Sequence, residues 1–460
     1  MRTTGARSLA LLLIILGFFA GLGYFLFGMA TKGGMYAAQP YNKHLTANGQ
    51  GSYTGAITDA SGTVLLKSEN GKQTYNSDEK IRRATVHIVG DTNGYISTGI
   101  QYNYRSQLAG YNPITGLAQP MGSKPTGSNI KLTVNSSLCK LALEKLGSRN
   151  GAAVLYNYKT GEILCMVSSP NFDPQNEPKD LSTNKKYEGV YLNRVLSSSY
   201  TPGSIFKLVT SAAAIENIPD IQSRTFHCTG SMIVNGNKIT CDSVHGTINF
   251  KNALAKSCNV TFAQLAMELG KDKMTAMANQ MGFNKSYSLD GIPTSKSVYN
   301  VSGAQQQDLA WSGIGQYTDT TNPYHMLLLM GAIANGGEPV NPYLIQSITS
   351  SYGLTTQSGH TTTGTRLLQT ETADQLKVMM RYNVTKDYGD SMFPGLSVCA
   401  KTGTAEVGSG KQPNGWMVGF SSNEKTPIAF AVVVEEGNYG RTSAGPIASA
   451  LMAAAAQSMK

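Results

Sequence analysis

Ser204 and Lys207 are the residues of this chain best spaced for covalent chemistry. Three positions apart on a helix, a hydroxyl and an amine share one face, so the amine can activate the hydroxyl as a nucleophile. The pattern Ser-x-x-Lys occurs six times, with serines at 77, 128, 137, 182, 204 and 422. Context must therefore distinguish one copy from the others.

Only the copy at Ser204 follows a turn, Thr201-Pro202-Gly203, and opens a helix that is apolar on most sides. Burial of such a helix would desolvate Lys207 and lower its pKa toward the neutral amine, which can accept the serine proton. The helix start would also offer the Ser204 backbone N–H to a developing oxyanion. The alternative is a serine N-cap beside a surface lysine.

Ser257-Cys258-Asn259 supplies a second hydroxyl and an amide. Ser-x-Asn also occurs elsewhere in the chain, but only this copy lies between Ser204 and the lysine motif described next. The Ser257 hydroxyl could pass a proton from the lysine to a leaving amine, while the Asn259 amide holds substrate and lysine together.

Lys401-Thr402-Gly403-Thr404 falls on a predicted strand, 396–406. A lysine, two hydroxyls and a residue without a side chain at a strand edge would bind a substrate carboxylate and let its backbone lie close. The Thr404 N–H could complete an oxyanion hole with that of Ser204. A second copy, Lys159-Thr160-Gly161, sits where a hairpin must turn, so we assign it no chemistry.

The cysteines and histidines form no CxxC, no HExxH and no paired-ligand spacing, so the sequence predicts no metal site and no cofactor. Cys228 and Cys241 bracket a short Gly/Asn-rich segment and could close it as a disulfide in an oxidising compartment. Free buried thiols are the alternative.

The elements that must position these motifs indicate an α+β fold. Residues 129–460 begin with strands and a helix, continue through a region of helical character at 200–340, and return to strands. We therefore expect one domain whose sheet is assembled from distant segments. The elements predicted around the motifs are strand 130–134, helix 136–146, hairpin 152–156 with 162–167, strands 396–406, 416–420 and 428–435, helix 446–457, and a polar loop at 350–365.

Residues 35–128 carry short alternating segments at 54–57, 64–66 and 84–89 and end in a turn-rich hinge. They predict a small β-rich domain.

The amino terminus, residues 1–34, contains an uncharged apolar run from Leu9 to Ala30. Its length suits a retained transmembrane helix better than a cleaved signal peptide, whose apolar region is shorter and ends in a small-residue cleavage site. Arg2 and Arg7 precede the run and only Lys32 closely follows it, so the tail should stay cytoplasmic and the rest should be exported. Gly17 and Gly21 would permit close contact with a partner helix.

The charge composition limits the classes of molecule that this protein could bind. The 460 residues carry 38 basic and 28 acidic side chains, a net charge of +10, without a Lys/Arg run that would follow a phosphate backbone. We expect no nucleic-acid partner; an anionic surface outside the cell fits better.

Together, the ordered motifs resemble the active-site serine penicillin-recognising enzymes. Flanking segments narrow the resemblance to class B penicillin-binding proteins, which are monofunctional peptidoglycan D,D-transpeptidases. The similar segments include 83–90 (RATVHIVG), 160–174 (TGEILCMVSSPNFDP), 193–216 and 398–420. The chain departs from the family at Gly315-Gln316-Tyr317, where Gly-Gln-Gly is more usual. It departs again after the lysine motif, in the segment 413–417 (PNGWM), which lacks the more usual His and Phe.

The resemblance implies a single transmembrane helix, a β-rich pedestal and a transpeptidase domain with an antiparallel five-stranded sheet between helical layers. It implies that Ser204 attacks the D-Ala-D-Ala bond of a stem peptide, with Lys207 as base and Ser257 as proton relay. Asn259, Lys401, Thr402, Gly403 and Thr404 would bind substrate. β-Lactam antibiotics would acylate the same serine, and a polytopic membrane glycan polymerase would be the partner in the bacterial cell membrane.

Three rival functions share much of this pattern. A class A β-lactamase would need a Glu-x-x-x-Asn segment between Ser257 and Lys401, and none is found there. A D,D-carboxypeptidase would use the same residues with water as acceptor. A non-enzymatic scaffold for a glycan polymerase is disfavoured because all three motifs are intact.

Overall fold

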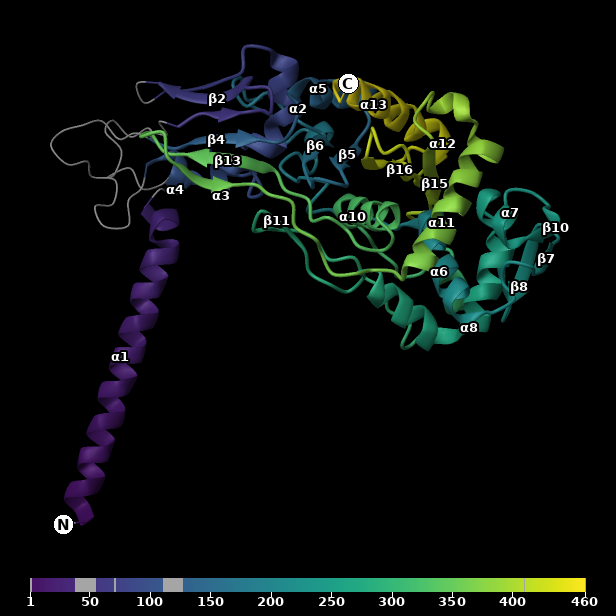
Figure 1. Ribbon diagram of the computed structural model, residues 1–460, viewed down its shortest axis with the longest axis horizontal. Coiled ribbons are helices and arrows are strands. Elements are labelled where there is room, and N and C mark those ends of the chain that lie inside the picture. Colours follow the sequence, from purple (N-terminus) through teal and green to yellow (C-terminus); the bar gives the residue numbers. More distant parts are fainter. Residues whose placement is uncertain (1, 38–54, 70–71, 111–126, 409, 460) are drawn as a thin grey trace.

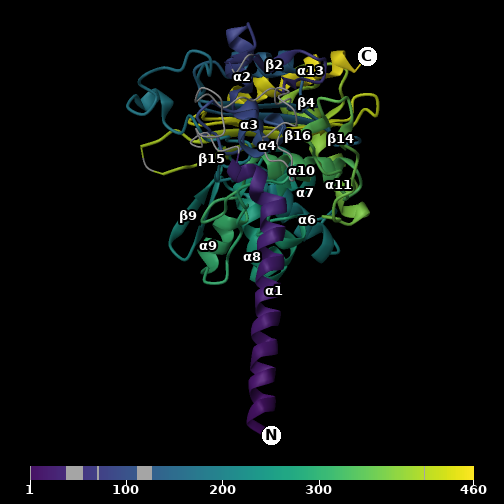
Figure 2. The ribbon, with the colours of Figure 1, turned by 90° about the vertical axis from the view of Figure 1, so that its left-hand side faces the viewer.

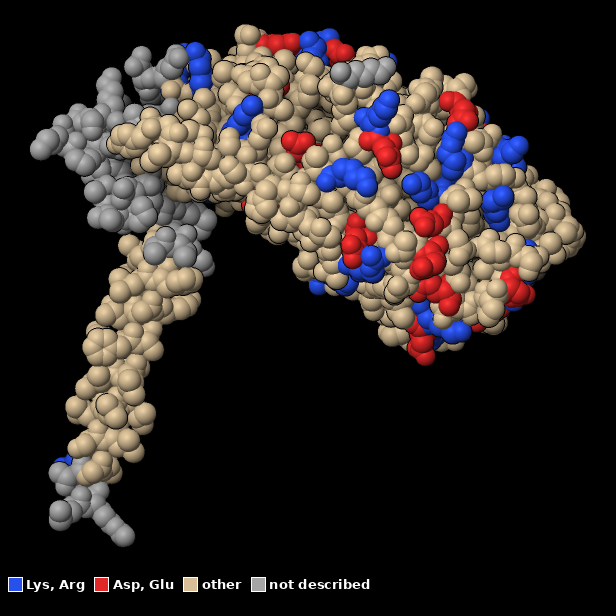
Figure 3. Space-filling view, viewed as in Figure 1, with Lys and Arg blue, Asp and Glu red and all other residues tan. Residues whose placement is uncertain are grey.

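The structure is a computed structural model that describes residues 2–37, 55–69, 72–110, 127–408 and 410–459. Its first element, α1 (Arg2–Ala37), projects from the rest of the molecule (Figures 1 and 2). Within the described ranges, α1 is the helix long and apolar enough to cross a membrane, over Gly5–Met29. Figure 3 shows α1 free of charged side chains along most of its length. The predicted span thus coincides with a continuous, exposed apolar helix.

A six-stranded sheet forms the end of the body nearest α1 (Figure 1). In sheet order its strands are β14 (Thr355–Ser358), β13 (Ile345–Thr349), β4 (Asn129–Leu132), β1 (Ile57–Thr58), β2 (Val64–Glu69) and β3 (Lys72–Tyr75). The pair β1 and β4 is parallel and the other pairs are antiparallel. The sheet therefore joins strands from both sides of residue 128. The predicted division of the chain at 128 stays a prediction.

Two details of this region correct the sequence analysis. Residues 84–89, predicted as a strand, lie in helix α2 (Glu79–Val89), whose Asp78 N-cap accepts a hydrogen bond from Lys80 N–H. Side chains 84–89 are all buried, so their alternation marks a helix packed on several sides rather than a half-exposed strand. The polar segment 350–365, predicted as a loop, contains the exposed strand β14. Part of the predicted strand 54–57 lies outside the described residues.

The second sheet confirms the predicted antiparallel five-stranded sheet. In sheet order its strands are β15 (Val398–Ala405), β16 (Asn414–Ser421), β17 (Ile428–Val434), β5 (Gly151–Asn157) and β6 (Ile163–Ser169). Every side chain of β16 and β17 is buried, which requires cover on both faces. Strands from the two ends of the domain meet where β17 pairs with β5.

Helices cover both faces of this sheet (Figure 1). One layer holds α5 (Ser136–Leu146), α13 (Gly445–Ser458) and α2, and the other holds α10 (Pro323–Ala334) and α11 (Thr370–Asn383). The helix α6 (Lys207–Asn217) is buried from Lys207 to Ala214. It packs with α8 (Asn259–Gln280), which is kinked at Gly270, on the side of α11 away from the six-stranded sheet. The α+β fold with a sheet between helical layers is confirmed.

The region 200–340 is less uniformly helical than predicted, since small two-stranded sheets interrupt it. They comprise β7 (Thr225–Cys228), β8 (Ser231–Val234), β9 (Asn237–Thr240), β10 (Gly246–Asn249), β11 (Ser288–Leu289) and β12 (Ile292–Pro293). The shorter helices are α3 (Ile100–Asn103), α4 (Arg105–Leu108), α7 (Phe250–Ala255), α9 (Gln306–Ser312) and α12 (Gly440–Ser443). Single turns of 3₁₀ or π type are η4 (Lys185–Tyr187), η5 (Gly203–Phe206), η6 (Val384–Tyr388) and η7 (Asp390–Met392).

Candidate active site

Ser204 lies in the 3₁₀ turn η5, immediately before α6 begins at Lys207. A 3₁₀ turn has three residues per turn, so side chains at i and i+3 eclipse one another. The Lys207 Nζ accordingly lies 2.9 Å from the Ser204 Oγ. Local backbone geometry thus produces the predicted pairing of hydroxyl and amine.

Gly203 lets this turn lie directly against the lysine-motif strand β15. Its φ of +54° is left-handed, and a Cβ added there would come within 2.4 Å of the Thr404 carbonyl oxygen. Only glycine fits that conformation and that approach. Gly403 on β15 has a related role, since a Cβ on it would lie 3.0 Å from the Ile205 side chain and from the Pro202 carbonyl oxygen. The two glycines hold the nucleophile turn and the strand in contact.

Lys207 is the centre of the site's hydrogen bonds and is fully buried. Its Nζ lies 2.6 Å from the Asn259 Oδ1, 2.7 Å from the Ser257 carbonyl oxygen and 3.0 Å from the Ser257 Oγ. Burial lowers the pKa of Lys207 from 10.5 to about 8. Its amine is therefore available in the neutral form near physiological pH.

The neutral amine has two N–H groups and one lone pair. The Asn259 Oδ1 and the Ser257 carbonyl oxygen can only accept, so they take the two N–H groups. The lone pair is then left for a hydroxyl proton, from Ser204 or Ser257. This is the arrangement that a general base requires.

Ser257 and Asn259 come from the turn between α7 and α8. Ser257 has a left-handed backbone with φ of +53°, and Asn259 is the first residue of α8. The Asn259 Nδ2 donates to the Thr240 carbonyl oxygen at 2.6 Å while its Oδ1 holds Lys207. The structure therefore joins the second motif to the first and to the end of β9.

Lys401 also converges on Ser257. Its Nζ lies 3.1 Å from the Ser257 Oγ and 2.9 Å from the Thr402 carbonyl oxygen. The side chain is fully buried, and burial together with the nearby Lys207 charge lowers its pKa well below the usual value. Strand β15 is at the sheet edge as predicted, but the amine points inward to Ser257. Carboxylate binding by Lys401 stays a prediction.

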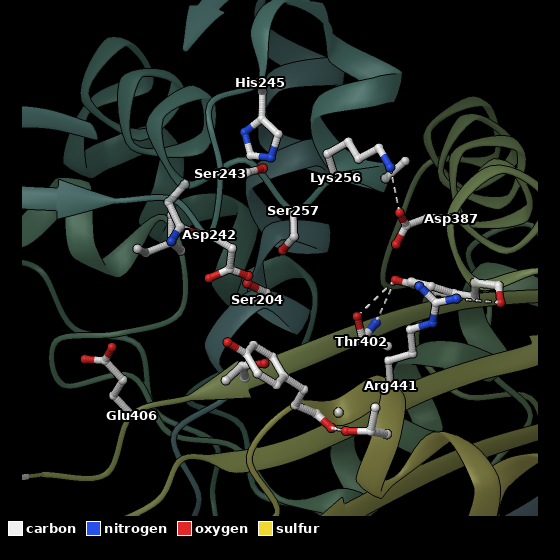
Figure 4. Close-up of a pocket in the computed structure, with 18 of the residues that line it drawn as sticks. Ser204, Asp242, Ser243, His245, Lys256, Ser257, Asp387, Thr402, Glu406 and Arg441 are labelled. Carbon is white, nitrogen blue, oxygen red and sulfur yellow. Dashed lines mark hydrogen bonds and ion pairs between the residues drawn. The ribbon is translucent and has the colours of Figure 1, made fainter. Parts of the chain in front are cut away.

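Thr402 and Thr404 face a cleft of about 460 Å³ together with Ser204, Ser257 and Asn259. Figure 4 shows Ser204, Ser257 and Thr402 around one opening, so the three predicted motifs meet at one place. The second copy of the lysine motif, Lys159-Thr160-Gly161, lies in the turn between β5 and β6, as expected.

Tyr388 and Arg441 are among the cleft-wall residues that sequence reasoning missed. The Tyr388 hydroxyl accepts from the Thr402 N–H at 3.0 Å and lies 3.1 Å from the Thr402 Oγ1. Arg441 lines the cleft beside Thr402 and donates to the Tyr388 carbonyl oxygen at 3.3 Å. Neither residue belongs to a short motif, so only their positions in space reveal them.

Sequence reasoning also missed a group of cysteines and a histidine next to the second motif. The Sγ atoms of Cys228, Cys241 and Cys258 and a ring nitrogen of His245 all lie within 4.8 Å of one another. The disulfide that Cys228 and Cys241 could form is absent, since the two sulfurs are 3.7 Å apart and all six cysteines are free, which is the alternative given above. The available sequence signal was Cys241-x-x-x-His245 with Cys258 inside the second motif.

The pKa of Lys207 predicts how acylation depends on pH. A base must be unprotonated, so its active fraction rises with pH and levels off above a pKa of about 8. We expect the second-order rate of penicillin labelling to be about 100-fold lower at pH 6 than on the plateau. Stopped-flow or gel-based labelling from pH 5 to pH 10 measures this, with thermal melts as a check on folding. A flat profile would show that Lys207 is not the base.

Comparison with known proteins places this geometry in a family. Residues 151–453 match the family model described as the penicillin binding protein transpeptidase domain. The chain belongs to this family. The matched segment contains all three motifs and all strands of the five-stranded sheet, from β5 to β17.

Relatives of the transpeptidase family match beyond that segment. The peptidoglycan D,D-transpeptidase PbpA of Mycolicibacterium smegmatis is 28% identical to this chain, over 91% of this chain and 92% of the PbpA sequence. The PbpA of Mycobacterium tuberculosis is 29% identical, over 73% of this chain and 74% of its own. Similarity to named transpeptidases thus extends over most of both chains.

Solved structures of the family share the fold. The ceftriaxone acyl-enzyme complex of penicillin-binding protein A from M. tuberculosis has a TM-score of 0.78 and 24% identity, covering 88% of this chain and 99% of its own. A D,D-transpeptidase domain from Eggerthella lenta has a TM-score of 0.75 and 26% identity, and the match covers 89% of this chain and 100% of that domain's chain. This chain is accordingly a penicillin-binding transpeptidase with an N-terminal apolar helix.

Proposed function

We propose that this protein is a class B peptidoglycan D,D-transpeptidase that cross-links stem peptides through an acyl-enzyme on Ser204. The observation that carries the proposal is the neutral-amine geometry at Lys207, which links Ser204, Ser257 and Asn259 in one buried network. The family match and the named D,D-transpeptidase relatives supply the reaction class.

In acylation, the Ser204 Oγ attacks the carbonyl carbon between the two D-alanines, and Lys207 takes the hydroxyl proton. The N–H groups of Ser204 and Thr404 stabilise the oxyanion, a contribution of about 3 to 4 kcal/mol for such a donor. The close approach of Gly203 to Thr404 supports this assignment, because it brings the two backbone segments together.

The proton then reaches the departing D-alanine amine through Ser257. Its Oγ lies between the amines of Lys207 and Lys401, at 3.0 and 3.1 Å, which suits a relay. Collapse of the tetrahedral intermediate breaks the peptide bond and releases D-alanine. An amine from a neighbouring stem peptide repeats the sequence in reverse and accepts the acyl group.

Substrate would lie along β15 between Thr402, Thr404 and the Asn259 amide. Because Lys401 is buried, Arg441 is a further cation within the cleft for the terminal carboxylate. β-Lactams would acylate the same serine because their ring amide mimics the D-Ala-D-Ala bond.

Product analysis tests the proposed reaction. Purified full-length protein in detergent is incubated with a stem pentapeptide and an acceptor amine, and the products are resolved by mass spectrometry. A D-alanine release matched by cross-linked product supports transpeptidation. Release without cross-link would assign a carboxypeptidase, and steady nitrocefin turnover rather than a single burst would assign a β-lactamase.

We also infer that α1 anchors the protein in the bacterial cell membrane with its amino terminus in the cytoplasm and contacts a polytopic glycan polymerase. Arg2 and Arg7 at its start support the orientation. A Cβ added at Gly17 or Gly21 would meet nothing within 4 Å, so that face of the helix is open for a partner helix.

A scrambled span tests the partner. Wild type and a variant with residues 9–30 shuffled at constant composition are expressed at equal levels and affinity-purified from membranes. We expect the polymerase to co-purify with wild type and to be reduced at least about tenfold with the shuffled span. Equal recovery would place the contact outside α1.

A further inference from the structure

We propose that Cys228, Cys241, His245 and Cys258 form a tetrahedral site for Zn²⁺ that fixes the second motif of the active site. The four residues come from separate elements. Cys228 ends β7, Cys241 follows β9, His245 precedes β10, and Cys258 is the N-cap of α8. A metal at their centre would tie the hairpin region to the turn that carries Ser257 and Asn259.

The spacing of the ligand atoms is that of a tetrahedral zinc site. Zinc–thiolate bonds of about 2.3 Å at tetrahedral angles put neighbouring sulfurs about 3.8 Å apart, and a sulfur and a nitrogen about 3.5 Å apart. The Cys241 Sγ lies 3.7 Å from the Cys228 Sγ and 3.8 Å from the Cys258 Sγ. The Cys228 Sγ lies 3.4 Å from the His245 Nδ1. Three thiols and an imidazole are also the ligand types of structural zinc.

A disulfide explains the arrangement less well. It would require two sulfurs at about 2.05 Å and would leave the third sulfur and the imidazole without a role. The Cys241 sulfur is instead nearly equidistant from its two neighbours. The geometry therefore points to one centre shared by four ligands.

Surrounding donors favour thiolates at this place. The backbone N–H groups of Asn259 and Val260, in the first turn of α8, donate to the Cys241 Sγ at 3.1 and 3.4 Å. The Thr261 Oγ1 lies 3.2 Å from the Cys258 Sγ. Hydrogen bonds to the ligand sulfurs and the N-terminal end of α8 stabilise their negative charge.

The site also has an entry path. Cys228 and Cys258 are buried, whereas Cys241 and His245 are partly exposed. His245 lines the active-site cleft, and Figure 4 shows it on the wall that also carries Ser243 and Ser257. A metal ion could reach the four ligands from the cleft.

The consequence for catalysis follows from Ser257, which is bonded to Cys258 and has a left-handed backbone. Such a conformation is strained for a residue other than glycine and persists only where its surroundings hold it. A metal bound to Cys258 and Cys241 would hold it and would orient Asn259, whose N–H donates to Cys241. The four ligands are thus positioning residues, and this part of the proposal rests on the proposed function.

Metal content of the full-length protein tests the site independently of activity. The protein is purified in detergent without chelator, equilibrated with Zn²⁺, desalted and analysed for metal, and the experiment is repeated with Co²⁺ for its absorption spectrum. We expect about one zinc per chain and the charge-transfer and d–d bands of a tetrahedral thiolate–cobalt site. Absence of zinc after equilibration, or an intact mass that shows a disulfide within the group, would overturn the proposal.

Matched variants locate the metal. His245→Ala and Cys228→Ser are expected to lose zinc, while His245→Cys, which keeps four ligands, retains it. His227→Ala, on the exposed side of β7, and Cys139→Ala, in α5, serve as controls that keep zinc. Zinc retained in both ligand variants would place the metal elsewhere and refute the assignment.

Labelling kinetics test the positioning role. We expect His245→Ala to acylate with penicillin about 10- to 100-fold more slowly, and His245→Cys to recover most of the rate. Unchanged labelling in a zinc-free His245→Ala protein would refute the positioning role. Zinc binding without any labelling of wild type would instead refute the proposed function while leaving the metal site supported.

Discussion

Ser204→Ala is expected to abolish covalent labelling by penicillin and to reduce cross-linking by a factor on the order of 10⁶. The Ser204 Oγ is the hydroxyl that lies 2.9 Å from the Lys207 amine and opens onto the cleft. Ser257 also lies beside Lys207, yet it sits between two lysines, where it suits proton transfer rather than attack. No other group would take over the acyl chemistry. Intact-mass analysis with and without penicillin measures the adduct directly.

The control for this variant is Ser211→Ala. Ser211 is buried in α6, and its hydroxyl has no hydrogen-bond partner among the described residues. It should label like wild type, so a loss confined to Ser204→Ala is chemical and not a consequence of altering α6. Persistent labelling of Ser204→Ala would reassign the nucleophile, and peptide mapping of the adduct would show where it went.

Lys207→Gln is expected to slow acylation by about 10² to 10⁴-fold, the usual contribution of general base catalysis. Glutamine retains N–H donors for the Asn259 Oδ1 and the Ser257 carbonyl oxygen, so the network is largely preserved. It has no amine lone pair to accept the Ser204 proton. Residual labelling should therefore lose the rise with pH that the neutral Lys207 produces in wild type.

The measurement is the second-order labelling rate over the same pH range as for wild type, with Lys271→Gln on the surface of α8 as a control for a lysine replacement. Thermal melts show whether the buried substitution has disturbed folding. A Lys207→Gln protein that labels within threefold of wild type, with its pH dependence intact, would move the base to Lys401.

Much of the secondary structure could be predicted from the sequence because it depends on local pattern. The helix 136–146 begins at an asparagine cap and ends before a glycine, and its predicted bounds match α5. The predicted strands 396–406, 416–420 and 428–435 correspond to β15, β16 and β17. The prediction of a strand at 84–89 was wrong. Its β-branched residues favour a strand, but caps and packing on several sides make it a helix.

The sequence by itself determined that the Ser204 hydroxyl and the Lys207 amine would be paired, because two residues three positions apart in a helical turn lie on the same face. It could rank Ser204 above five similar copies only through context. Tertiary structure decided where the amine of Lys401 points, that Tyr388 and Arg441 border the cleft, and that three cysteines and a histidine meet beside Ser257. Those contacts join elements far apart along the chain, so they depend on how sheets and helices pack. No local periodicity encodes them.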